Sequence, residues 1–262
     1  MNLNLQSYTA LVCGSSQGIG RAAAQELALL GARVILLARN EESLKVTCSE
    51  LPTPNGQKHD YLAADFSNPS KVAEVVANFI SAGNPIHILV NNTGGPPGGP
   101  IVNATTEAFL STFHQHLLCN HLITQAVLPG MKEAKFGRII NIISTSVKQP
   151  LKGLGVSNTI RAAVANWSKT LSVEVAPFGI TVNNVLPGAT ATQRLSSIIE
   201  NKSQKQNNSI DEVEQEMLAE IPAARFGKPE EIAAAVAFLA SPAAAYINGI
   251  NVPVDGGRTG CL

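Results

Sequence analysis

Short apolar runs alternate with longer stretches of helical spacing along almost the whole chain. The runs read TALVCG, RVILLA, DYLAA, HILVNN, RIINII and ITVNNVL, and the stretches between them carry Ala-rich faces. Runs that are apolar at consecutive positions are typical of parallel strands covered on both sides. Strand, helix and strand in this rhythm imply right-handed crossovers. The sequence therefore predicts an α/β fold, with one domain over residues 1–262 built on a doubly wound parallel sheet with helices on both faces.

Composition and charge exclude several classes of protein. The 262 residues are 45% hydrophobic, and 19 basic side chains balance 19 acidic ones, so a surface that follows nucleic acid is not expected. No apolar run reaches the roughly 18 residues of a membrane span, and the first residues lack the pattern of a secretory signal. We therefore expect no nucleic acid, no membrane and a cytoplasmic location. The four cysteines lack C-x-x-C spacing, so we expect reduced thiols and no metal site.

A glycine-rich turn follows the first apolar run. In CGSSQGIGRAAAQEL, residues 13–27, Gly14, Gly18 and Gly20 allow a sharp turn and a close approach of the backbone to a pyrophosphate. The helix expected from Gly18 would point its N-terminal amides at that negative charge. A strand before the glycines and a helix after them is the context of a dinucleotide-binding, Rossmann-type fold.

The spacing G-x-x-x-G-x-G and further motifs resemble the short-chain dehydrogenase/reductase family. The motifs are AADF at 63–66, VNNTGG at 90–95, GRIINIIS at 137–144, ITVNNVLPGATAT at 180–192, RFGKPEEIAAAVAFLASP at 225–242 and INGINVPVDGG at 247–257. They cover essentially the whole chain in the family's order. The resemblance is greatest to the branch of the β-ketoacyl-acyl-carrier-protein reductases, and it implies an oxidoreductase that uses a nicotinamide cofactor on a carbonyl or alcohol substrate.

The resemblance also implies cofactor contacts. Asp65 matches the aspartate that binds the adenine amino group, and Asn91 begins the stretch that supports the sheet and borders the adenine ribose. Pro187, Gly188 and Thr192 match the element that holds the nicotinamide carboxamide. The full cofactor set implied is Gly14, Ser16, Gly18, Ile19, Gly20, Arg39, Asp65, Asn91, Gly94, Pro187, Gly188 and Thr192.

The end of the second strand predicts which dinucleotide is bound. Ala38 stands where members that prefer NAD carry an acidic residue, and Arg39 follows it. A guanidinium can hold the 2′-phosphate of NADP with two hydrogen bonds, so NADP(H) is favoured over NAD(H). The alternative is a solvated surface charge, and Gln17 stands where many relatives that prefer NADP have a second basic residue.

The family's proton-transfer residues are largely replaced. Ser144 falls at the position of the serine that polarises the carbonyl, but Ser157 stands at the tyrosine position, Arg161 at the lysine position and His116 at the asparagine position. The three tyrosines, Tyr8, Tyr61 and Tyr246, cannot be shifted into register. A serine hydroxyl is a far weaker acid than a phenol, and a guanidinium does not lose its proton.

Three interpretations remain open at this stage. The chain is a reductase or dehydrogenase in which Ser144, Ser157 and Arg161 polarise the carbonyl and His116, Lys148 or Lys152 supplies the proton. The alternative for His116 is a packing residue, and that for the lysines is surface charge. In the second interpretation the chain binds NADP(H) without turnover, as a redox-sensing or regulatory module. In the third interpretation it is a structural subunit beside an active partner. The first is favoured, because the cofactor carries the hydride.

Two further expectations concern shape and assembly. The polar stretch 193–215 interrupts the alternation, which predicts an irregular insertion that acts as a mobile substrate lid over about 193–224. The alternative is a tolerated surface loop. Long helices over 105–131 and 157–176 and the last strand match the family's interfaces, which implies a homotetramer.

Overall fold

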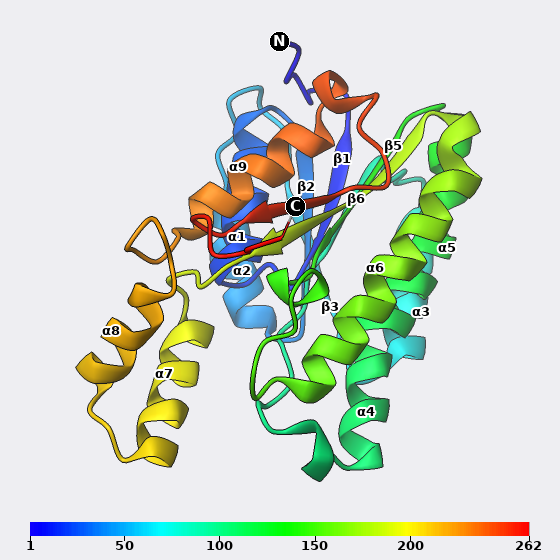
Figure 1. The fold of residues 1–262 in the computed structure, drawn as a ribbon. Helices are drawn as coiled ribbons and strands as arrows, with labels where there is room; N and C mark the ends of the chain where they lie inside the picture. The colour runs from blue at the N-terminus through cyan, green and yellow to red at the C-terminus, as the bar shows by residue number, and fades with distance from the viewer. Residues whose placement is uncertain (262) are drawn as a thin grey trace.

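Seven parallel strands form one sheet in the computed structural model, which describes residues 1–261. The order across the sheet is β3-β2-β1-β4-β5-β6-β7 (Figure 1). The strands are β1 (Thr9–Cys13), β2 (Arg33–Ala38), β3 (Asp60–Ala63), β4 (Ile88–Asn91), β5 (Gly137–Ile142), β6 (Ile180–Pro187) and β7 (Asn251–Val254). Strands are added outward in one direction from β1 to β3 and in the other from β4 to β7, so the sheet is doubly wound and the predicted Rossmann-type fold class is confirmed.

Helices cover both faces of this sheet. They are α1 (Gly18–Leu29), α2 (Glu41–Glu50), α3 (Pro69–Ser81), α4 (Thr106–Phe113), α5 (Cys119–Glu133), α6 (Gly155–Val175), α7 (Gln193–Gln206), α8 (Ile210–Ala219) and α9 (Pro229–Ala240). One face packs on α1, α2 and α9, and the other packs on α3, α5 and the end of α6 (Figure 1). Successive residues of β1 alternate between the two cores, Ala10 and Val12 in one and Leu11 and Cys13 in the other, which explains the unbroken apolar runs.

Two expected elements differ in detail from the structure. The helix expected over 105–131 consists of α4, a π-helical turn at His114–Leu118 and α5, because one wide turn interrupts the 3.6-residue spacing. The expectation of an irregular chain at 193–215 is wrong. Thr192 caps α7, a Ser209–Glu212 capping box begins α8, and the two helices share the small apolar cluster of Leu195, Ile199 and Val213.

Within residues 1–261, no helix combines the length and the apolar character that a membrane crossing requires. The same residues contain no group of three or more His, Cys, Asp or Glu side chains arranged to hold a metal ion.

Buried asparagines form a ladder across four neighbouring strands. The Asn91 amide donates to Asn141 Oδ1 over 2.9 Å, Asn141 donates to Asn184 Oδ1 over 2.9 Å, and Asn184 donates to Asn251 Oδ1 over 2.8 Å. Each pair stands at matching positions of adjacent parallel strands. The Asn141 amide also donates to Ser168 of α6 over 3.2 Å. A one-residue slip of any of these strands would break the ladder and leave buried amides unpaired.

We predict that Asn141→Ala lowers the free energy of unfolding by about 3 kcal/mol, because it leaves amide groups on both neighbouring strands without partners. Urea unfolding followed by circular dichroism measures this loss. The control is Asn103→Ala, at an exposed position, which should stay within about 0.5 kcal/mol of the unchanged protein. Equal effects of the two substitutions would contradict a structural role for the ladder.

Candidate active site

The glycine turn between β1 and α1 has no room for a Cβ at Gly14 or Gly20. A Cβ on Gly20 would lie 2.2 Å from the Gly14 carbonyl oxygen, and Gly14 and Gly18 have φ angles of +57° and +55°. α1 begins at Gly18, its first turn has no acidic residue, and the Gln17 side chain does not cap it. The N-terminal amides of α1 therefore have no side-chain partner from either source. Such a cradle fits a pyrophosphate. Ser16 and Ile19 lie in the same turn, both partly buried.

Asn92 ties this turn to β4, and the sequence analysis did not single it out. Its amide lies 3.3 Å from the Cys13 carbonyl oxygen and 3.2 Å from that of Gly14. Asn91 behaves differently, because its side chain is 1% exposed and belongs to the ladder. Its amide joins neighbouring strands and lies within the sheet rather than on an open crevice wall.

Arg39 and Asp65 follow neighbouring strands at their carboxyl ends, and both are exposed. Asp65 Oδ1 accepts a hydrogen bond from the Ser67 backbone amide over 2.8 Å. This bond is the main reason why the pKa of Asp65 is lowered, and the positive charge of Arg39 contributes as well. A carboxylate and a guanidinium therefore stand together where the adenine half of a dinucleotide would lie.

The segment after β6 reaches back to the glycine turn. Gly188 packs so tightly on β7 that a Cβ would lie 2.7 Å from the Cα of Asp255. Thr192 caps α7, and its methyl group lies 3.3 Å from the point where a Cβ on Gly18 would stand. The first residues of α1 and of α7 are therefore in contact, as a site for the nicotinamide half requires.

The expected catalytic residues lie at the carboxyl end of β5 and the start of α6. Ser144 follows β5, and its Oγ accepts a hydrogen bond from the Ser146 amide over 3.1 Å. Ser157 and Arg161 are four residues apart on α6 and so share one face of the helix. The Arg161 guanidinium donates from Nη1 to the Ile142 carbonyl oxygen over 3.0 Å.

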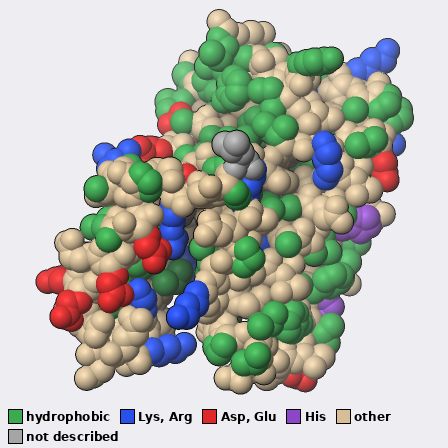
Figure 2. Space-filling model, viewed as in Figure 1, with side chains coloured by type: hydrophobic (Ala, Val, Ile, Leu, Met, Phe, Trp, Pro, Cys, Tyr) green, Lys and Arg blue, Asp and Glu red, His purple; other side chains and the backbone are tan. Residues whose placement is uncertain are grey.

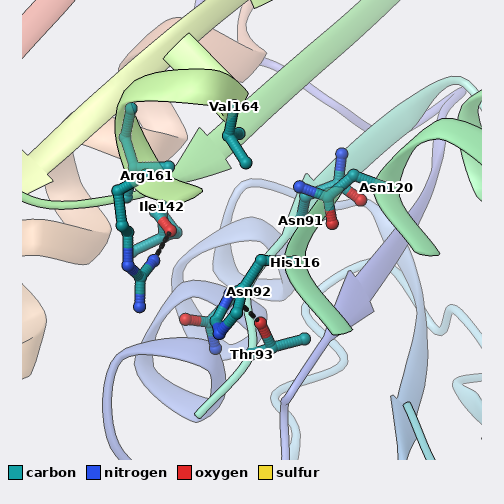
Figure 3. Close-up of a pocket in the computed structure, with 9 residues that line it drawn as sticks. Asn91, Asn92, Thr93, His116, Asn120, Ile142, Arg161 and Val164 are labelled. Carbon is teal, nitrogen blue, oxygen red and sulfur yellow. Dashed lines mark hydrogen bonds between the residues drawn. The ribbon is translucent and has the colours of Figure 1, made fainter. Parts of the chain in front are cut away.

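Arg161 and His116 line one small polar pocket, but Ser144 and Ser157 do not line it. The lining residues are Asn91, Asn92, Thr93, His116, Asn120, Ile142, Ile143, Arg161 and Val164. Figure 3 shows Arg161 and Ile142 on one side of this pocket and Asn91 and Asn120 on the other. Gly94, an expected cofactor contact, directly follows the pocket residue Thr93, and its backbone is exposed.

His116 does not titrate near neutrality, contrary to the expectation for a proton donor. Its side chain is buried, its Nδ1 lies 2.6 Å from Thr93 Oγ1, and its Nε2 has no partner in residues 1–261. Burial, with the nearby charge of Arg161, lowers the pKa of His116 to about 3. The imidazole is therefore neutral at physiological pH.

The sequence analysis missed a second cation near Arg161. Arg194, in the first turn of α7, donates from Nη2 to the Pro96 carbonyl oxygen over 2.6 Å. Burial, and to a lesser extent the charge of Arg194, together lower the pKa of Arg161 to about 10. Arg161 still remains protonated at neutral pH. Position 194 belongs to no motif, so only its closeness to Thr192 could have indicated it.

All three tyrosines lie outside the pocket. Tyr8 stacks on Phe136 with ring centroids 3.9 Å apart, and Tyr61 donates to Glu41 over 3.4 Å. Tyr246 is fully exposed. No phenol therefore stands near Ser144 or Arg161.

We predict that His116 makes the protein less stable in acid. The unfolded chain takes up a proton at His116 below its ordinary pKa of 6.5, whereas the folded chain resists protonation until about pH 3. Stability contributed by this residue is therefore present above pH 6.5 and is lost at about 1.4 kcal/mol per pH unit as the pH falls toward 3. In urea unfolding between pH 7.5 and pH 4.5, His116→Asn should show a shallower loss than the unchanged protein. Parallel curves would contradict the assignment.

Comparison with known proteins agrees with this geometry. A family model described as enoyl-(acyl carrier protein) reductase matches residues 14–259. The chain is 33% identical to the NADPH-dependent reductase BacG of Bacillus subtilis, over 97% of this chain and 98% of that protein. It is 36% identical to the 3-oxoacyl-(acyl-carrier-protein) reductase FabG of Vibrio cholerae, over 97% and 98%. The crystal structure of L-sorbose reductase from Gluconobacter frateurii, complexed with NADPH and L-sorbose, superposes with a TM-score of 0.93 at 31% identity over all of both chains. The chain therefore belongs to the short-chain dehydrogenase/reductase family, and it resembles the β-ketoacyl-acyl-carrier-protein reductases within it.

Proposed function

We propose that this protein is an NADP(H)-dependent oxidoreductase that acts on a carbonyl or hydroxyl substrate with an atypical catalytic site. One observation carries the proposal. The half-buried Arg161 guanidinium is fixed to the Ile142 carbonyl oxygen at the same edge of the sheet as the glycine turn. A permanent cation and a cradle for a dinucleotide therefore lie at one edge of one sheet.

The cofactor would be held by the residues around the turn. The α1 amides of Gly18 and Gly20 would bind the pyrophosphate, Asp65 the adenine, Arg39 the 2′-phosphate, and Thr192 the nicotinamide. The relatives support this choice, since BacG is named for NADPH and the L-sorbose reductase structure contains it. When bound, the reduced cofactor supplies a hydride to the carbonyl carbon.

The chain's own residues would stabilise charge rather than donate a proton. As hydride adds to the carbon, the electron pair of the C=O bond moves to the oxygen, where Arg161 and the hydroxyls of Ser144 and Ser157 would hold it. Arg161 stays protonated, and His116 is neutral with a pKa of about 3, so the proton would come from solvent. Proton transfer by a side chain contributes typically about 10²- to 10⁴-fold, so turnover slower than in typical members is expected.

A second candidate function is a subunit that binds NADP(H) without turnover. The specific observation in its favour is the same pair of pKa values, about 3 for His116 and about 10 for Arg161, because neither group exchanges protons near neutrality. In that case the glycine turn would be kept for binding alone.

The homotetramer and the cytoplasmic location are kept as part of this proposal. Large apolar side chains are exposed on the two helices that match the family's interface, Leu110 and Phe113 on α4 and Val173 on α6. Contiguous exposed apolar surface is typical of contacts between proteins. The same helices would meet their copies in a tetramer.

We predict that the protein binds NADPH and oxidises it slowly with activated carbonyl compounds. Enhancement of NADPH fluorescence measures binding, and loss of absorbance at the reduced nicotinamide band measures turnover. Ser144→Ala should lower kcat with little change in NADPH affinity. Binding without turnover across a broad panel of ketones would favour the non-catalytic subunit, and absence of binding would overturn both functions.

We predict that Arg39 determines the choice of cofactor. Arg39→Ala removes a guanidinium that can pair with the 2′-phosphate, so NADPH affinity should fall about 10- to 100-fold and NADH affinity by less than about 3-fold. The control is Lys58→Ala, which removes an exposed positive charge before β3, at the other end of the sheet. Equal weakening of NADPH and NADH by Arg39→Ala would refute this role.

A further inference from the structure

Two guanidinium groups converge beside one glycine next to the pocket. A Cβ on Gly95 would lie 3.5 Å from Arg194 Nη2 and 3.7 Å from Arg161 Nη2. Arg161 comes from α6 and Arg194 from α7, so two different helices bring their cations to the same point beside Gly95. Figure 2 shows Lys and Arg side chains gathered along the crevice beside the α7–α8 hairpin.

No carboxylate of residues 1–261 compensates this pair. Neither arginine takes part in an ion pair, whereas the hairpin's own Lys202 pairs with Glu216 over 2.8 Å. The neighbouring His116 is neutral, so it neither adds positive charge nor compensates the charge of the two guanidiniums. Two like charges held close together in a partly buried site raise the free energy of the folded protein unless an anion joins them.

The donors left free suit a flat anion. Arg161 uses Nη1 on the Ile142 carbonyl oxygen, and Arg194 uses Nη2 on the Pro96 carbonyl oxygen. Each guanidinium carries five N–H donors in a plane, so each keeps several for a ligand. Planar forks of this kind match the two oxygens of a carboxylate.

The segment at 94–100, which carries Gly95, is hydrogen-bonded to the start of α6. The Gly99 amide donates to the Gly153 carbonyl oxygen over 2.7 Å, and the Gly155 amide donates to the Gly99 carbonyl oxygen over 3.1 Å. These bonds join the 94–100 segment to the start of α6, the helix that carries Arg161. Gly99 is therefore held against the start of α6 by hydrogen bonds of both its amide and its carbonyl group.

We infer that Arg161 and Arg194 bind a carboxylate of the substrate, so that the substrate is an oxo acid or the corresponding hydroxy acid. This inference rests on the proposed function, because Arg161 is the cation assigned above to the carbonyl oxygen. A carboxylate one or two carbons from the carbonyl carbon would let one guanidinium contact both groups. The cofactor's pyrophosphate is a different anion with its own cradle at Gly14–Gly20.

The first test compares an acid with its ester on the protein saturated with NADP⁺, where no reduction can occur. We expect 2-oxo-4-phenylbutanoate to bind at least about 10-fold more tightly than its ethyl ester in calorimetric titration, as a charge-assisted hydrogen bond pair implies. Arg194→Gln should remove this preference, and Arg194→Lys should keep part of it. Equal binding of acid and ester by the unchanged protein would overturn the inference.

The second test places a carboxylate between the two arginines. Gly95 has no positive φ, and its Cβ would make only ordinary contacts, so a side chain is sterically allowed there. Gly95→Asp would pair with both guanidiniums, whereas Gly95→Asn has the same shape without the charge. We expect the Asp variant to melt at a higher temperature than the Asn variant and to lose the preference for the acid. An Asp variant that is no more stable than the Asn variant and keeps the preference would overturn the inference.

These results are separable from the fate of the proposed function. NADPH binding and reduction of the neutral ester measure the oxidoreductase function alone. If the ester is reduced and the acid is not preferred, the function stands and the carboxylate site is wrong. If the acid is preferred in binding but no carbonyl compound is reduced, the carboxylate site stands and turnover is wrong.

Discussion

The amide ladder across β4, β5, β6 and β7 fixes the edge of the sheet on which the site depends. Asn141 is fully buried and pairs with asparagines on both sides, so the three neighbouring strands are held in one register. Because the strands are parallel, their carboxyl ends then meet at the same edge. The residues that follow them, Asn92 after β4, Ser144 after β5 and Gly188 after β6, arrive together there. Unpaired buried amides would be costly, so register and site geometry are specified by the same hydrogen bonds.

The strands and the glycine turn could be predicted from the sequence, since both depend on the local pattern of residues. An unbroken apolar run indicates a strand with two buried faces. The glycine spacing indicates a tight turn, which has no room for a Cβ at Gly14 and Gly20. The hairpin of α7 and α8 was not predicted, because polar residues fill most of both helices. Its order depends on caps at Thr192 and Ser209 and on a cluster that only the folded hairpin brings together.

The site was predicted less completely for the same reason. Family spacing identified the position of Arg161, but nothing in the sequence indicates that Arg194 approaches Gly95 beside it. The low pKa of His116 likewise comes from burial and from Arg161, which are tertiary properties. A histidine in a sequence carries its ordinary pKa, and its environment alone decides whether it can act as an acid.

The charges of Arg161 and Arg194 are physically linked in the proposed site. Burial and the charge of Arg194 both disfavour the charged form of the side chain at position 161. Together they lower the pKa of Arg161 to about 10. A lysine ammonium begins from a lower ordinary pKa, so the same surroundings would bring it closer to losing its charge at neutral pH. Only a guanidinium keeps a secure positive charge beside a second cation. The proposed site can therefore hold two positive charges for an anion, although neither guanidinium can exchange a proton with the substrate near neutral pH.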